Sequence, residues 1–217
     1  ALLKDSMTKS FMSGLIARHL GLRAKLPGAE EAFIGGMCQN LGENLVIFYF
    51  PDEYDDIVAL QERENLDKAA AARGVLGVGY SEVGAAVAKS WNLPNSIIEA
   101  IRGVPPGALA QPVTDEEKLR DLAVFSNELC DLFQHHERDD IDEALLKLLV
   151  RFTPSVILDP AFCRKLVTAV FEKLKQFAPI FEINVATNNY CRGVQAWVDV
   201  QPAAEDGDTP VAKSVSN

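Results

Sequence analysis

The sequence predicts an all-α fold, and three observations support that class. Apolar residues recur at three- and four-residue spacing along most of the chain, helix start and stop signals divide it, and no segment sustains the alternation typical of a half-buried strand. The 217 residues are 48% hydrophobic, enough to form a large core without disulfide or metal staples. We therefore expect a compact bundle of many helices.

The first two predicted helices carry the strongest patterns. The first spans residues 2–20 and ends at Gly21, and its expected buried face consists of Leu3, Met7, Phe11, Leu15 and His19. The second is a central helix that includes residues 32–50, AFIGGMCQNLGENLVIFYF. This stretch is apolar on all sides, which is typical of a helix buried by several neighbours, and Pro51 ends it.

Shorter helices follow in the middle of the chain. A polar surface helix is predicted over 53–64, and Asp67 caps the next one, which ends at Leu76. Ser81 is expected to cap a helix that ends at Trp91, with a core stripe formed by Val83, Val87 and Trp91. Pro94 opens the helix that covers residues 95–102.

The C-terminal half is predicted to hold longer helices. Thr114 and Glu117 form a capping box for a helix that runs to about Gln134. Further helices are predicted over 140–152 and from Asp159-Pro160 to Phe177. Residues 181–185 suggest a short extended piece, and residues 201–217 have a composition typical of disorder. We accordingly divide the chain into a helical domain, 1–178, and a partly irregular C-terminal extension, 179–217.

Bulk properties narrow the classes of partner. The net charge of −10 argues against nucleic acid and against an anionic membrane, because either partner would require clustered Lys and Arg. The four dispersed cysteines are typical of reduced thiols, so we expect a cytoplasmic protein. The longest apolar run is too short to span a bilayer. The chain begins without Met, and we expect it to be a piece of a longer protein.

Two segments carry a family resemblance. Residues 32–50 have the small-apolar frame Phe33, Gly36, Leu41 and Gly42, and residues 75–102 contain Leu76-Gly77, Glu82-Val83-Gly84, Trp91 and Leu93-Pro94. Together, at this distance, they resemble the HD-related output domain (HDOD) of bacterial signalling proteins, a branch of the HD phosphohydrolase superfamily. The resemblance covers about residues 5–135 and implies an HD-like helical bundle, with Gly36, Gly42, Gly77, Gly84, Trp91 and Pro94 as structural motif positions.

The resemblance also implies where metal ligands would lie. In the HD superfamily an early His, an adjacent His-Asp pair and a later Asp hold a divalent ion that activates water. These positions fall at Lys9, Gln39-Asn40 and Asn127, and Tyr80 replaces a frequent His. A lysine ammonium cannot ligate a cation, and neutral amides are weak ligands. We therefore expect no metal, no cofactor and no catalytic residue in this relic pocket.

Simpler structural roles remain open for the same residues. Gln39 and Asn40 are expected to form a buried amide pair bonded to backbone or water, Lys9 to lie on a solvated helix face, and Trp91 to anchor the core. His135-His136, beside Glu137, Asp139 and Asp140, could take up a transition metal weakly, but a solvated corner is the simpler interpretation. Cys38 is interpreted as core.

The function expected is that of a non-catalytic output module of a bacterial signal-transduction protein, for example the output part of a response regulator in a two-component system. Its partners would be other signalling proteins or domains of the same polypeptide, and homo-oligomerisation is left open. One alternative is a nucleotide-like ligand sensor that uses the relic pocket. Another is a metal-dependent phosphohydrolase with relocated ligands, through His19 or the His135 cluster.

Overall fold

A computed structural model describes residues 2–135 and 138–199, and these residues form helices α1 to α11 with no strand among them. The prediction of an all-α bundle is confirmed. The helices are α1 (Leu2–Arg23), α2 (Ala29–Cys38), α3 (Leu41–Tyr49), α4 (Pro51–Glu64), α5 (Lys68–Leu76), α6 (Tyr80–Ser90), α7 (Asn95–Arg102), α8 (Asp115–His135), α9 (Arg138–Phe152), α10 (Pro160–Phe177) and α11 (Asn189–Val198).

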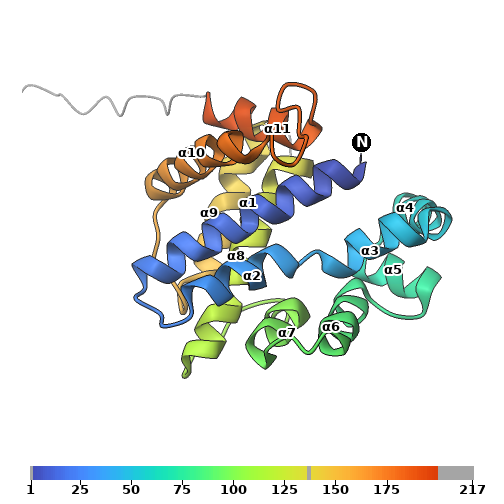
Figure 1. Ribbon diagram of the computed structural model, residues 1–217, viewed down its shortest axis with the longest axis horizontal. Coiled ribbons are helices and arrows are strands. Elements are labelled where there is room, and N and C mark those ends of the chain that lie inside the picture. Colours follow the sequence, from blue (N-terminus) through green and yellow to red (C-terminus); the bar gives the residue numbers. More distant parts are fainter. Residues whose placement is uncertain (1, 136–137, 200–217) are drawn as a thin grey trace, which may run out of the picture.

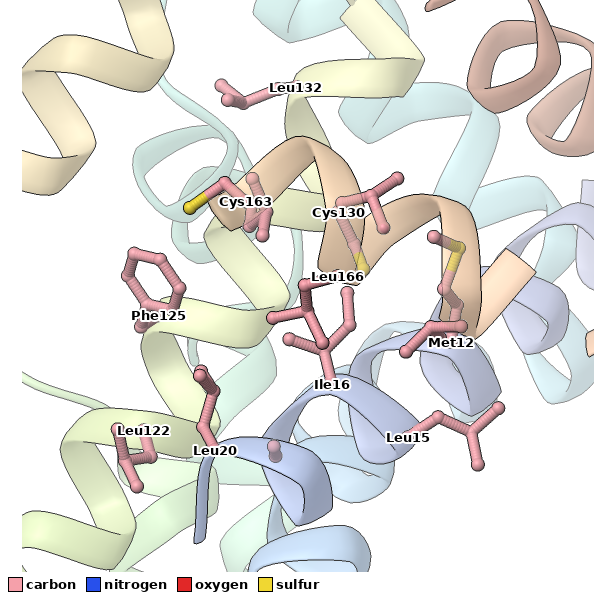
Figure 2. Packing of buried hydrophobic residues seen from close by; sticks show 14 of the residues in the cluster. Met12, Leu15, Ile16, Leu20, Leu122, Phe125, Cys130, Leu132, Cys163 and Leu166 are labelled. Atoms are coloured by element: carbon pink, nitrogen blue, oxygen red, sulfur yellow. The ribbon is translucent and has the colours of Figure 1, made fainter. Parts of the chain in front are cut away.

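Helix α1 is the axis of the bundle. It packs on α2, α3, α8, α10 and α11, and Figure 1 shows α10 and α11 on one side of it and α6 and α7 on the other. The main core lies between α1, α8, α9, α10 and α11. Figure 2 shows how Met12, Ile16 and Leu20 of α1 meet side chains of α8 and α10 there, and all three are essentially inaccessible to water.

Helices α3, α4 and α5 form a separate lobe with its own small core. Val46, Ile57, Ala71 and Ala72 make up that core, which does not merge with the main one. We call residues 41–76 the α3–α5 lobe, and it lies at the right-hand end of the molecule in Figure 1. Helix α3 joins the lobe to the rest because it contacts α1 and α6.

Two glycines allow helices to approach closely at the join. A Cβ on Gly36 would lie 2.9 Å from the Cβ of Ala17 in α1, and a Cβ on Gly42 would collide with the carbonyl oxygen of Tyr80 in α6. Both contacts involve neighbouring helices, and only glycine permits this spacing. These two family-motif positions therefore fix how α2 meets α1 and how α3 meets α6.

Most predicted helix starts are confirmed by their capping bonds. Asp67 accepts a hydrogen bond from the Ala70 amide at 2.7 Å, and Asp159 accepts one from the Phe162 amide at 2.7 Å. Thr114 and Glu117 form the expected reciprocal box. Each cap satisfies a backbone amide that the first helical turn leaves without an intrahelical partner.

The prediction of one continuous central helix is wrong. The chain leaves the helix at Gln39 and Asn40, so α2 ends at Cys38 and α3 begins at Leu41. Asn40 adopts φ −98° and ψ 15° and its carbonyl starts α3 by accepting from the Asn44 amide at 2.9 Å. The polar side chain of Asn40 finds its partners outside the helix, and the contact at Gly42 redirects the chain that follows.

Two predictions about buried faces are also wrong. In α1, Met7 and His19 are exposed, whereas small polar residues are buried, because helices surround α1 on several sides. Trp91, which directly follows α6, is 57% exposed, and within α6 Gly84, Ala85 and Ala88 are buried instead. The close contact between α3 and α6 accommodates only this thin face. The helix also starts at Tyr80, with Gly79 rather than Ser81 as its cap.

The C-terminal region contains a helix that the sequence did not predict. Residues 181–185 combine turns and irregular backbone and contain no strand, and α11 follows, with Asn188 accepting from the Cys191 amide at 2.9 Å. Tyr190, Cys191, Val194 and Trp197 of α11 belong to the main core. The predicted disorder of 201–217 lies outside the described residues.

We predict that Gly42→Ala lowers the free energy of unfolding by about 3 kcal/mol, since the new methyl group meets a backbone oxygen that cannot move aside. Gly21→Ala is the matched control, because its Cβ would meet nothing closer than 3.4 Å and alanine favours the helix by roughly 0.5 to 1 kcal/mol. Urea unfolding measures both. Equal effects of the two substitutions would contradict the assigned contact.

Candidate functional site

A pocket of about 370 Å³ opens where α3, α5, α6, α7 and α8 meet. Four of the five predicted relic-pocket residues line it: Gln39, Asn40, Tyr80 and Asn127. The fifth, Lys9, reaches its edge through a bond to Asp131, which also lines the pocket. The structure thus brings together all five residues chosen from the sequence.

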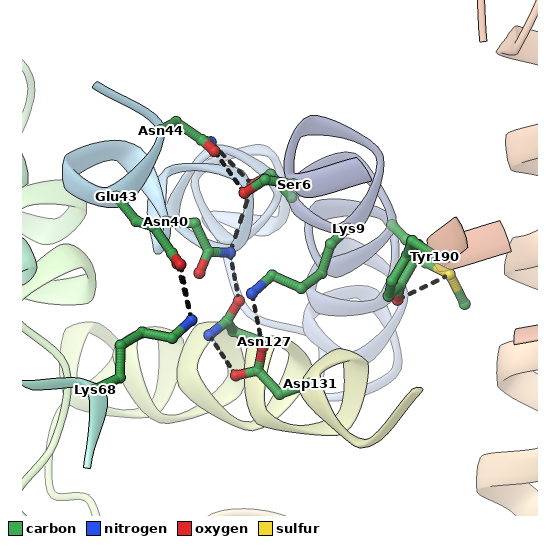
Figure 3. A network of polar contacts seen from close by, with 11 residues as sticks. Ser6, Lys9, Asn40, Glu43, Asn44, Lys68, Asn127, Asp131 and Tyr190 are labelled. Atoms are coloured by element: carbon green, nitrogen blue, oxygen red, sulfur yellow. Dashed lines mark hydrogen bonds and ion pairs between the residues drawn. The ribbon is translucent and has the colours of Figure 1, made fainter. Parts of the chain in front are cut away.

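A continuous chain of polar contacts joins three helices at the pocket. Asn40 donates to the Asn127 side-chain oxygen at 2.6 Å, and Asn127 donates to Asp131 at 3.3 Å. The Lys9 ammonium donates to the other Asp131 oxygen at 2.6 Å. Figure 3 shows this sequence of bonds running from the start of α3 through α8 to α1. Asn40 also lies 3.4 Å from the Ser10 hydroxyl.

Lys9 is not on a solvated helix face, contrary to the prediction. Its side chain is 1% exposed, and the Asp131 carboxylate that pairs with it is 35% exposed. A buried ammonium without a partner would be very unfavourable, so the ion pair is required for α1 to pack against α8. The polar residues around Lys9 in α1 hid this from sequence analysis, because they resemble a surface face.

Gln39 and Tyr80 contribute differently to the pocket wall. Gln39 donates to the carbonyl of Ala100 in α7, which agrees with the expected bond to backbone, although Gln39 is only partly buried. The Tyr80 hydroxyl is buried and has no hydrogen-bond partner within residues 2–135 and 138–199. Burial raises the pKa of Tyr80 strongly, and the nearby Glu43 carboxylate adds to the shift, so the phenol stays protonated.

The pocket also contains charged pairs that sequence analysis missed. Glu43, which is buried, accepts bonds from Lys68 at 2.9 and 3.0 Å. Burial alone would lower the pKa of Lys68, but the carboxylates of Glu43 and Asp131 outweigh it and the net shift is upward. Glu128 is bonded to Arg151 at 2.6 Å, and burial raises its pKa despite that cation. Their partners are distant in sequence, so no local pattern indicates them.

Each acidic side chain in the pocket is thus matched by a cationic side chain of the protein. Glu43 pairs with Lys68, Glu128 with Arg151, and Asp131 with Lys9. Across the described residues, no three His, Cys, Asp or Glu side chains converge as a cation site would require. Arg73 and Arg102 also line the pocket and pair with Glu82 and Glu99, and its neutral side chains include Gln39, Asn40, Asn127 and Tyr80. This arrangement suits hydrogen bonding to a ligand or to another protein.

The other sites considered from the sequence lie elsewhere. His19 is exposed on α1, and the cysteines 130, 163 and 191 are buried and free, while Cys38 is partly buried. Burial raises the pKa of the Cys38 thiol, which makes it a poor nucleophile. The proposed histidine cluster depends on His136 and Glu137, which fall outside the described residues. None of the helices that the structure describes combines the length and apolarity needed to cross a membrane.

Comparison with known proteins supports the family resemblance. Residues 1–104 match the model of the HDOD domain, so the resemblance is confirmed over that range. An "Uncharacterized protein" of Treponema pallidum (strain Nichols) is 31% identical over 103 residues, which are 46% of this chain but only 20% of that protein.

A solved structure is similar over more of the chain. It is a protein named "Putative phosphohydrolase" from Shewanella amazonensis SB2B, with a TM-score of 0.54 and 18% identity. The similarity covers 90% of this chain and 64% of that one. At this identity the likeness establishes the fold alone, which is an all-α helical bundle.

We predict that Asp131→Ala lowers the free energy of unfolding by about 3 kcal/mol, because it leaves the buried Lys9 ammonium unpaired. Lys9→Met should lower it by only about 1 kcal/mol, since water reaches the Asp131 carboxylate. The double variant should be more stable than Asp131→Ala alone. Urea unfolding of all three variants and of the unaltered protein completes a double-mutant cycle. Equal losses of stability in the two single variants would contradict the prediction that the unpaired Lys9 is the more costly of the two.

Proposed function

Because residues 1–104 match the HDOD domain, we propose that this protein is a non-catalytic regulatory module of a bacterial signal-transduction protein. It would act by contact with other signalling proteins or with other domains of its own polypeptide. A response regulator of a two-component system is the setting that the HDOD resemblance favours. The match covers only 20% of the relative's length, so the activity of the whole protein is part of the proposal.

One observation carries the non-catalytic interpretation. The positions at which the HD superfamily holds its metal are occupied by Lys9, Gln39, Asn40 and Asn127, and their side chains bond to one another or to neighbouring protein groups. The Lys9 ammonium supplies a fixed positive charge bonded to Asp131, where a ligand set would require anionic or imidazole groups. Metal-activated water would have no anionic anchor among these residues.

The test is a metal and turnover assay. After dialysis against excess Mn²⁺, we expect no stoichiometric metal by elemental analysis and no hydrolysis of cyclic nucleotides. A variant that combines Lys9→His, Gln39→His, Asn40→Asp and Asn127→Asp reintroduces the family ligands and serves as the positive control for metal uptake. Stoichiometric metal together with turnover by the unaltered protein would refute the proposal.

A second candidate function is a small-ligand sensor, and the pocket itself favours it. Gln39, Asn40, Asn127 and Tyr80 line a cavity of about 370 Å³, and the cationic side chains Lys68, Arg73 and Arg102 line the same cavity. These groups suit an anionic, nucleotide-like ligand. Such a ligand would bridge helices of the lobe and of the main bundle, and its binding would alter how firmly they are held together.

We predict that a ligand bound at about one hundred times its Kd raises the free energy of unfolding by about 2.7 kcal/mol in a thermal-shift screen of nucleotides. Arg102→Ala should reduce that shift, because it removes an exposed cation from the cavity wall, whereas Tyr80→Phe should leave the unliganded protein about 1 kcal/mol more stable, because an unpartnered buried hydroxyl is removed. The absence of stabilisation by every nucleotide tested would count against the sensor.

A further inference from the structure

A group of aromatic side chains is exposed at the outer end of the α3–α5 lobe. Phe48, Tyr49 and Phe50 are 61%, 64% and 51% exposed, and the rings of Phe48 and Tyr49 contact edge to face at 4.8 Å between centroids. Single exposed apolar residues are ordinary, but here three aromatic residues in a row are exposed. Aromatic anchors of this kind contribute much of the binding free energy in protein interfaces.

The helix that follows this patch carries strong negative charge. Helix α4 contains six carboxylates and one guanidinium, and Phe50 directly precedes its first turn. Asp52 and Glu53 suit a helix N-terminus, but Glu62 and Glu64 lie near the C-terminus, where negative charge is unfavourable. The requirements of the helix therefore do not account for the acidic excess.

The carboxylates at the start of α4 are available for an external partner. Asp52, Glu53, Asp55 and Asp56 are exposed and take part in no ion pair in the part of the chain that the structure describes. Their negative charges are therefore not neutralised within the described residues, and they follow the exposed aromatic residues directly in the chain. An apolar patch with a charged border of one sign selects a partner of complementary pattern.

We propose that Phe48, Tyr49, Phe50 and the exposed carboxylates of α4 form a docking surface for a basic amphipathic helix of another protein. We call it the aromatic–acidic surface. Apolar residues on one face of the partner would cover the aromatic side chains, and its flanking Lys and Arg would face α4. The proposal rests on the proposed function as a protein-contacting module and specifies the chemistry of its partner.

The same charges disfavour two other occupants. A second copy of this chain would bring one acidic α4 close to the other, and like charges across an interface are unfavourable. An anionic membrane surface would repel the same carboxylates, because lipid-binding helices present Lys and Arg to the headgroups. A basic amphipathic helix would complement both the aromatic side chains and the carboxylates of the aromatic–acidic surface.

The test uses the full chain and a labelled model peptide. The peptide is a helix about five turns long with Leu at the i, i+3, i+4 and i+7 positions and Lys on the flanks, and a second peptide replaces every Lys with Glu. Fluorescence anisotropy at about 0.05 M and about 0.3 M salt measures binding. We expect the basic peptide to bind, more weakly at high salt, and the acidic peptide not to bind.

Variants assign the binding to the surface. Phe48→Ser with Phe50→Ser should weaken binding roughly tenfold through the lost anchors. Asp55→Lys with Asp56→Lys should weaken it roughly tenfold at low salt and less at high salt. The matched control is Leu146→Ser with Val150→Ser, an exposed apolar pair on α9, which should bind as the unaltered protein does.

Several outcomes would overturn the proposal. They are no binding of the basic peptide, equal binding of both peptides, or undiminished binding by the Phe48/Phe50 variant. Dimerisation that the Phe48/Phe50 variant abolishes would assign the surface to a second copy. Cosedimentation with phosphatidylserine vesicles that the same variant abolishes would assign it to a membrane. If the basic peptide does not bind and the protein shows no metal-dependent turnover, the docking surface is refuted but the non-catalytic function is not. Metal-dependent turnover would refute the non-catalytic function.

Discussion

The buried charge of Lys9 is the constraint on which the rest of the site depends. An ammonium group that is 1% exposed needs a carboxylate in contact, and Asp131 on α8 supplies it at 2.6 Å. The pair fixes α1 relative to α8, and Asn127 and Asn40 extend the contact to the start of α3. An internal cation thus stabilises helices that meet around a polar pocket.

The break between α2 and α3 serves the same arrangement. If residues 29–49 formed one helix, Gln39 and Asn40 would follow its surface and could not both reach their partners. The break lets Gln39 bond to α7 while Asn40 bonds to α8, and Gly42 then brings α3 against α6. The break in the helix therefore positions the side chains of Gln39 and Asn40, and it falls within the family motif.

Sequence patterns predicted the helical class, most helix boundaries and four of the residues that line the pocket, since capping residues, prolines and the family motif act locally. They did not predict the burial of Lys9, the exposure of Trp91 or the break at Asn40. Those features depend on which helices surround a given face, and that information lies in contacts between residues as distant as Lys9 and Asp131. Helix α11 was missed because the turns before it resemble an irregular tail.

The small separate core of the α3–α5 lobe has a consequence for the pocket. Val46, Ile57, Ala71 and Ala72 form a small core of their own, so we expect this lobe to open locally at a lower free energy than the whole bundle unfolds. Asn40 directly precedes α3 and Lys68 begins α5, and both residues line the pocket. Local opening of the lobe would therefore disrupt the pocket wall. The stability of the pocket and that of the lobe are therefore coupled. A molecule that binds either one in its closed form would also stabilise the other.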